Sequence, residues 1–221
     1  MRKKLIAITG PSAFTPNVRS MVEDYLNFNF IEVNSNKQDN LNEVASLCDG
    51  IIFAGGVDLF PPYYGSSLKK HEGLTSFDPM RDKREKHLLS VFKDLNKPIF
   101  GICRGFQMIC VEAGFKIIQD LSFSNISHSP TADGMKLDRE VCDDTHFIKF
   151  YNKDIKEGFV NSIHHQGIEE PMGTLHDNVK HGLTCIAYAN TKSARPDIIE
   201  WVEGVEGQKL IAVQFHPELS Y

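Results

Sequence analysis

The sequence predicts an α/β fold built on a mostly parallel β-sheet, and three observations support this. In the first half of the chain, short runs of β-branched and aromatic residues alternate with stretches whose apolar residues recur every three or four positions, as in βαβ units. The short runs are apolar throughout, which is typical of parallel strands covered on both faces. The 221 residues, 41% of them hydrophobic, can bury a core without disulfides or metals. We expect a single domain over residues 1–221.

The predicted elements follow a regular order along the first hundred residues. Four short apolar runs are expected to be strands, at residues 5–9, 30–33, 51–54 and 98–102. Helical spacing of apolar residues predicts helices at residues 16–27, 40–48 and 81–95, with another directly after the fourth strand. Proline, tyrosine and glycine mark residues 57–80 as a long loop.

The pattern changes after about residue 120. Residues 122–145 are polar and are expected to form an irregular surface segment. Four later runs alternate like antiparallel or mixed strands, at residues 146–150, 185–189, 198–202 and 210–215.

Charge and cysteine content exclude several classes of function. The net charge of -5, from 29 acidic and 24 basic residues, argues against a nucleic-acid partner. No stretch approaches the ~18 apolar residues of a membrane span, and the apolar run after the basic start of the chain stops at Gly10, too early for a signal sequence. Five widely spaced cysteines without a C-x-x-C pair fit neither a disulfide framework nor a zinc site. We therefore expect a cytoplasmic protein.

The segment 101–107, G-I-C-R-G-F-Q, carries the strongest chemical signal. A buried strand runs directly into a helix there, with Cys103 at the corner and a glycine two residues away on either side. In this nucleophile-elbow arrangement the glycines allow a sharp turn and close helix packing. A helix N-terminus also favours the thiolate form of a cysteine. The pattern favours a nucleophile, although a core cysteine in a glycine-rich turn would look the same.

A strand near the end of the chain supplies a candidate base. The segment 213–218, V-Q-F-H-P-E, ends in His216 with Glu218 two residues on. His216 could take the thiol proton while Glu218 orients the imidazole and stabilises its charged form. A histidine after a strand is often structural, so this interpretation depends on its combination with Cys103.

Together, segments 101–107 and 213–218 resemble class I glutamine amidotransferases. The resemblance implies a flavodoxin-like three-layer α/β sandwich with a central, mostly parallel sheet. It also implies a Cys-His-Glu triad formed by Cys103, His216 and Glu218.

Three further segments resemble one branch of that family, the γ-glutamyl-γ-aminobutyrate hydrolases (peptidase C26). They are G-G-V-D-L-F-P-P-Y-Y-G at 55–65, the D-x-x-R-D-x-x-E pattern at 78–85, and V-N-S-I-H-H-Q at 160–166. The motifs span residues 51–218, so the resemblance covers nearly the whole chain.

The resemblance implies roles for individual residues. The backbone amides of Gly56 and Arg104 would form an oxyanion hole, in which one donor is worth about 3–4 kcal/mol. Residues that would hold the glutamyl group or line the mouth of the site share a place in these motifs: Gly55, Asp58, Tyr64, Arg81, Asp82, Gln107, His164, His165 and Gln166. The alternative for Gln107 is a position in solvent. The alternative for the acidic residues is a solvated loop or a helix cap, and Asp78 is a candidate N-cap.

Adjacent histidines such as His164 and His165 point in different directions, so we expect no metal site.

The chain also departs from the family. Residues 110–116, C-V-E-A-G-F-K, lack the usual asparagine and second glycine after the elbow. Segment 122–145 is short and unlike the usual histidine-containing loop, of which His128 is a candidate remnant. These differences leave the identity of the departing amine open, but they do not affect the residues of the triad.

The expected function is cysteine-dependent hydrolysis of the γ-glutamyl amide of a small amine, without a cofactor. One alternative is a glutaminase subunit that delivers ammonia to a separate synthase partner. Another is a catalytically silent binding module. The oligomeric state is left open, a homodimer being one option.

Overall fold

The computed structural model describes residues 2–11, 15–33, 40–67, 76–121, 146–151, 157–170, 179–180, 182–189, 197–205 and 207–219. The polar segment 122–145, with His128, lies outside these residues. Within them, no helix is long and apolar enough to cross a membrane.

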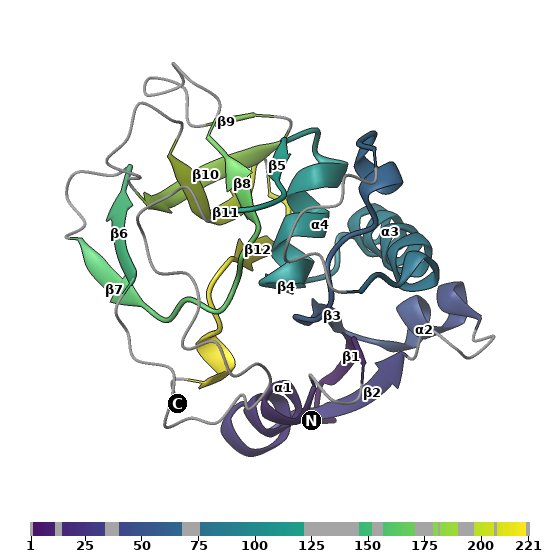
Figure 1. Cartoon of the computed structure of the whole chain (residues 1–221). Helices are drawn as coiled ribbons and strands as arrows, with labels where there is room; N and C mark the ends of the chain where they lie inside the picture. Colours follow the sequence, from purple (N-terminus) through teal and green to yellow (C-terminus); the bar gives the residue numbers. More distant parts are fainter. Residues whose placement is uncertain are drawn as a thin grey trace.

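One mixed sheet organises the described residues (Figure 1). Parallel strands form one half of it, in the order β2 (Asn29–Val33), β1 (Leu5–Thr9), β3 (Gly50–Phe53), β4 (Ile99–Ile102) and β12 (Leu210–Val213). Antiparallel strands continue it as β11 (Ile198–Gly204), β10 (Leu183–Ala189), β6 (His146–Phe150) and β7 (Gly158–Val160). Three short strands pair beside this path: β5 (Ile117–Ile118), β8 (Gly167–Glu169) and β9 (Val179–Lys180).

Helices cover both faces of the parallel strands. One face carries α1 (Pro16–Ser20) and the π-helical turn η1 (Met21–Tyr25), while α2 (Leu41–Leu47), α3 (Pro79–Asp94) and α4 (Arg104–Glu112) cover the other. Neighbouring residues of one strand accordingly enter different clusters: Ile51 packs with α2, α3 and α4, and Ile52 packs with α1 and η1. Because both faces are buried, the strands are apolar throughout. The predicted flavodoxin-like α/β class is confirmed.

Two predicted helices differ in detail. The single helix expected at 16–27 is α1 followed by η1, and it ends before Asn27, whose φ of 54° is left-handed. The helix expected from residue 81 begins at Pro79, inside the segment expected to be loop, because proline suits the first helical position. Asp78 caps it by accepting a hydrogen bond from Arg81 N at 2.9 Å, as expected.

Helix α4 packs unusually close to the sheet at its N-terminus. A Cβ atom added to Gly105 would overlap the carbonyl oxygen of Phe53 in β3. One added to Gly101 would lie 2.6 Å from Ile109 Cδ1 and 3.0 Å from Ala212 Cβ. The two glycines that flank Cys103 therefore fix how tightly the strand turns into the helix.

We expect Gly105→Ala to lower the free energy of unfolding by about 1–3 kcal/mol or more, because the new methyl group meets a backbone carbonyl that cannot give way. Denaturant unfolding measures this. The matched control is Gly158→Ala, whose Cβ would meet, among the described residues, only Phe150 Cε2 at 3.9 Å. Equal stability of the two variants would contradict the packing argument.

Candidate active site

Cys103 occupies a strained position where β4 ends and α4 begins. Its φ of 51° and ψ of -104° lie outside the regions that residues with side chains normally adopt. Its amide donates to the Val213 carbonyl at 2.8 Å, and it is the N-cap residue of α4. The side chain is buried, with 7% of the residue exposed. The thiol thus lies at the N-terminus of a helix, beside the positive end of the helix dipole.

His216 reaches Cys103 because their strands are neighbours. β12 runs parallel to β4 with Val213 opposite Ile102, so the residues after both strands meet at one edge. A Cβ placed on Gly55 would lie 3.0 Å from His216 Cε1 and 3.8 Å from Cys103 Cβ, so both side chains border the same small space. His216 Nδ1 donates to Glu218 Oε1 at 2.7 Å. The structure therefore brings Cys103, His216 and Glu218 together, all buried.

The surroundings of His216 favour its charged form. Burial on its own would lower the pKa of His216, but Glu218 and Cys103, through their negative charges and hydrogen bonds, raise it well above its usual range. The site can thus hold a proton on His216 beside the sulfur.

Asn161 was not predicted as a site residue, yet it holds His216 in place. Its side-chain oxygen accepts from the His216 amide at 2.8 Å, and its Nδ2 donates to the His216 carbonyl at 2.8 Å. The only signal for it in the sequence is its place in the segment 160–166, because an asparagine in a loop is otherwise typical of a turn.

The structure places Arg81 under the glycine loop, where it is 2% exposed, and not at the mouth of the site. Its nitrogens donate to Glu85 and to the carbonyls of Ala54 and Gly55. Asp82 is equally buried and paired with Arg104. Both side chains are fully engaged within the protein, which argues against the direct substrate contact expected of Arg81.

Asp58 and His165 do meet, as their shared place at the predicted mouth implies. His165 Nε2 donates to Asp58 Oδ1 at 2.9 Å, and the side chain of His165 is 40% exposed. This hydrogen bond with Asp58 raises the pKa of His165, against the opposing effect of partial burial. Among the described residues, the buried Oδ2 atom of Asp58 has no hydrogen-bond partner. The structure thus joins two of the residues expected at the mouth as a polar, ionisable pair.

Gln107 and Gln166 lie together behind the elbow. Gln107 Nε2 donates to the Gln166 carbonyl at 3.3 Å and to Gln214 Oε1 at 3.1 Å. His164 Nδ1 donates to the same carbonyl at 2.8 Å, and its other nitrogen faces the buried Glu200 at 3.8 Å. The side-chain amide of Gln166 is buried, and neither of its polar atoms has a partner in the described part of the chain.

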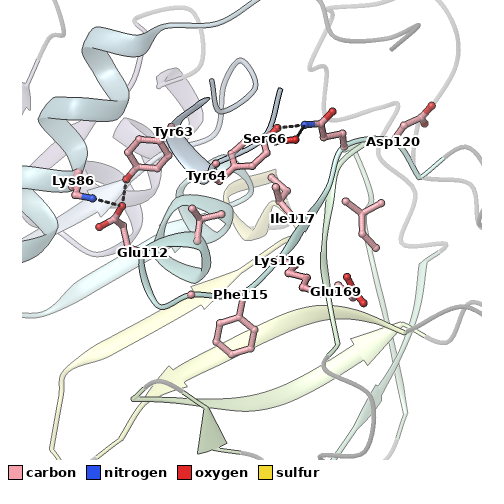
Figure 2. A pocket seen from close by; sticks show the side chains of 15 residues that line it. Tyr63, Tyr64, Ser66, Lys86, Glu112, Phe115, Lys116, Ile117, Asp120 and Glu169 are labelled. Atoms are coloured by element: carbon pink, nitrogen blue, oxygen red, sulfur yellow. Dashed lines mark hydrogen bonds and ion pairs between the residues drawn. The ribbon is translucent and has the colours of Figure 1, made fainter. Parts of the chain in front are cut away.

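Tyr64 lines a cavity of about 850 Å³ that none of Cys103, His216 and Glu218 reaches (Figure 2). Its hydroxyl accepts from Gln119 Nε2 at 2.8 Å. On the same wall Glu112, at the end of α4 opposite Cys103, accepts hydrogen bonds from two neighbours, Tyr63 and Lys86. A contact between Tyr64 and substrate stays a prediction.

The residues described by the structure contain no group of three or more His, Cys, Asp or Glu side chains that could hold a metal ion.

The fold, with this arrangement at the carboxyl edge of its sheet, is that of the class I glutamine amidotransferase-like proteins. The chain belongs to the Peptidase C26 family, whose sequence model matches residues 15–218. These relationships place it among hydrolases and amidotransferases that act on glutamine-type amides.

Two relatives illustrate the match. A glutamine amidotransferase-like protein of Lactococcus lactis, YvdE, is 33% identical over 189 residues, which are 84% of this chain and 72% of that protein. Protein NtpR of Enterococcus hirae is 32% identical over 181 residues, covering 78% of this chain and 68% of that one.

Solved structures share the fold at low sequence identity. A glutamine amidotransferase of Thermotoga maritima superimposes with a TM-score of 0.59 at 14% identity, covering 99% of this chain and 77% of that chain. The glutaminase domain of Trypanosoma brucei CTPS with bound acivicin gives a TM-score of 0.59 at 16% identity, covering 97% and 86%.

We expect Glu218→Gln to lower the pKa of His216, because it removes a buried negative charge bonded to the imidazole. Since the folded-state pKa of His216 lies above its unfolded value of about 6.5, its stabilising contribution is full below that value and is lost as the pH rises through the folded pKa. The substitution should shrink this contribution. NMR titration of the imidazole and unfolding free energies measured against pH test both effects.

The control for that experiment is Glu23→Gln, which removes an exposed carboxylate of η1. An unchanged pKa of His216 in Glu218→Gln would contradict the role given to Glu218.

Proposed function

We propose that this protein is a cysteine hydrolase that cleaves the γ-glutamyl amide bond of a small γ-glutamyl amine, with Cys103, His216 and Glu218 as its triad. The observation that carries the proposal is the strained, helix-capping position of Cys103 beside an imidazole fixed on a buried carboxylate. A silent binding module has no need for such a strained arrangement.

In the first step the Cys103 thiolate attacks the γ-carbonyl carbon of the substrate. The carbonyl oxygen becomes an oxyanion, which accepts hydrogen bonds from the amides of Gly56 and Arg104. The imidazolium of His216 gives its proton to the amine nitrogen as the C–N bond breaks. The amine leaves, and a γ-glutamyl thioester remains on Cys103.

In the second step water replaces the amine. Neutral His216 takes a proton from the water, whose oxygen attacks the thioester carbonyl. The C–S bond breaks, glutamate leaves, and the thiolate is restored beside the imidazolium. Throughout, Glu218 holds the imidazole orientation and stabilises its charge.

Recognition of the glutamyl group falls to the residues behind the elbow. The buried amide of Gln166 offers a donor and an acceptor to the α-carboxylate and α-amino groups, and Gln107 holds the adjoining peptide. The Asp58–His165 pair borders the mouth, where the leaving amine would pass. The second carboxylate oxygen of Asp58, which has no partner among the described residues, can accept a hydrogen bond from an amine that carries a positive charge.

The alternative is a glutaminase subunit that hands ammonia to a synthase. The relative YvdE carries the name glutamine amidotransferase-like, and such a role would require a separate partner for this chain. The G-G-V-D-L-F-P-P-Y-Y-G loop at 55–65 favours the hydrolase.

Glutamate release by the purified protein tests the proposal, with glutamine, γ-glutamyl-putrescine and γ-glutamyl-γ-aminobutyrate as substrates. We expect release from the γ-glutamyl amines, with the cationic putrescine conjugate preferred, and its loss in Cys103→Ala. The control Cys48→Ala, which alters another buried thiol, should stay active. Release from glutamine alone would favour the glutaminase, and an active Cys103→Ala would disprove the nucleophile.

A further inference from the structure

We propose that Arg81 is a positioning residue that orients the first oxyanion-hole amide and, through a buried ion network, ties it to the second. The inference rests on the proposed function, because it takes the amides of Gly56 and Arg104 as the donors. It assigns Arg81 a role within the protein in place of a contact with substrate.

Arg81 fixes the peptide unit that joins Gly55 to Gly56. Its Nη1 donates to the Gly55 carbonyl at 3.1 Å, and its Nη2 donates to the preceding carbonyl, that of Ala54, at 2.7 Å. The C=O and N–H groups of a trans peptide point in opposite directions. With the Gly55 carbonyl held toward the guanidinium, the Gly56 N–H of the same peptide points away from it.

Gly56 allows this contact because it lacks a side chain. Its φ is +146°, and a Cβ atom there would overlap Arg81 Nη1. The loop therefore lies directly on the guanidinium. On its other side, Gly55 borders His216 and Cys103. The loop is thus held between Arg81 and the catalytic pair.

The carboxylate of Glu85 links Arg81 to Arg104, the residue that carries the second donor, and Asp82 anchors Arg104 further. Glu85 Oε1 accepts from Arg81 Nε at 2.7 Å, and its other oxygen accepts from the Arg104 side chain. Asp82 also accepts from Arg104, and its second oxygen accepts from Phe60 N at 3.0 Å. Arg104 thus has its side chain anchored in the network, and its own amide is the second donor of the proposed oxyanion hole.

The network also reaches the first strand, since Thr9 Oγ1 donates to Glu85 Oε1 at 2.6 Å. It therefore ties β1, the loop after β3, the helix α3 and the elbow together.

The charges in this network balance, with two arginines against two carboxylates, and each residue is at most 2% exposed. Burial lowers the pKa of Arg81 to about 10, helped by the nearby charge of Arg104, so the guanidinium remains protonated at neutral pH. A buried ion network often stabilises a fold no better than apolar residues of the same volume. Its directional hydrogen bonds instead offer fixed geometry, which an oxyanion hole requires.

Two reactions of Cys103 distinguish a positioning role of Arg81 from a general disruption of the site. p-Nitrophenyl acetate acylates the thiolate: sulfur attacks the carbonyl carbon, an oxyanion forms, and nitrophenolate leaves. Iodoacetamide alkylates it: sulfur displaces iodide from a saturated carbon, and no oxyanion forms. Only the first reaction uses the oxyanion hole.

We expect Arg81→Met to slow acylation, and the kcat of amide hydrolysis, by about 10- to 100-fold, because a donor displaced by about 1 Å has effects of that size. The KM and the rate of alkylation should stay near wild type. Arg81→Lys should recover part of the loss. Lys83→Met removes an exposed cation of the same helix and serves as the control with wild-type rates.

Parallel loss of acylation and alkylation in a folded Arg81→Met, or no loss of either, would overturn the inference. If Arg81→Met does not fold, Arg81→Lys carries the test, because it keeps the charge but cannot donate to Glu85, Gly55 and Ala54 at once. A wild-type protein that is acylated but hydrolyses no γ-glutamyl amine would refute the proposed substrate and leave the Arg81 inference standing. If neither reagent modifies Cys103 of the wild-type protein, both the proposed function and the Arg81 inference are overturned.

Discussion

The close approach of α4 to the sheet is the constraint on which the rest of the site depends. Gly105 lies against the Phe53 carbonyl, and this contact forces the chain between β4 and α4 into a turn with a positive φ at Cys103. The fold carries the cost of that conformation, of order 1–3 kcal/mol. In return, the thiol projects from the end of the sheet onto a helix N-terminus, and the backbone geometry sets its position beside His216.

Each of the other components of the site is held in place beside Cys103 by its own set of contacts. The parallel register of β4 and β12 brings His216 alongside, Asn161 holds its backbone, and Glu218 holds its ring. Arg81 supports the glycine loop from the opposite side. Since these anchors are buried hydrogen bonds or ladder pairs, the geometry is set before a substrate arrives, which is the arrangement that electrostatic stabilisation of a transition state needs.

Much of this was predictable from the sequence, because apolar periodicity and short glycine-bearing motifs are local features. They indicated the parallel strands, the elbow at Cys103 and the segment around His216. The direction of a side chain depends on the tertiary packing around it, which local sequence patterns do not show. Arg81 was therefore expected at the mouth, although it points into the protein. Two- and three-residue strands such as Ile117–Ile118 are too short to show a period. Asn161 acts through a partner 55 residues away, a separation that no local pattern encodes.

The central claim is that Cys103 carries a γ-glutamyl group during turnover, and mass spectrometry of the acid-quenched protein tests it most directly. Protein mixed with a γ-glutamyl amine and quenched during turnover should gain the mass of one glutamyl group, located on the peptide that contains Cys103. The adduct should be absent from Cys103→Ala and should disappear once the substrate is consumed. Glutamate release without any adduct at early times, or an adduct on another residue, would contradict the account.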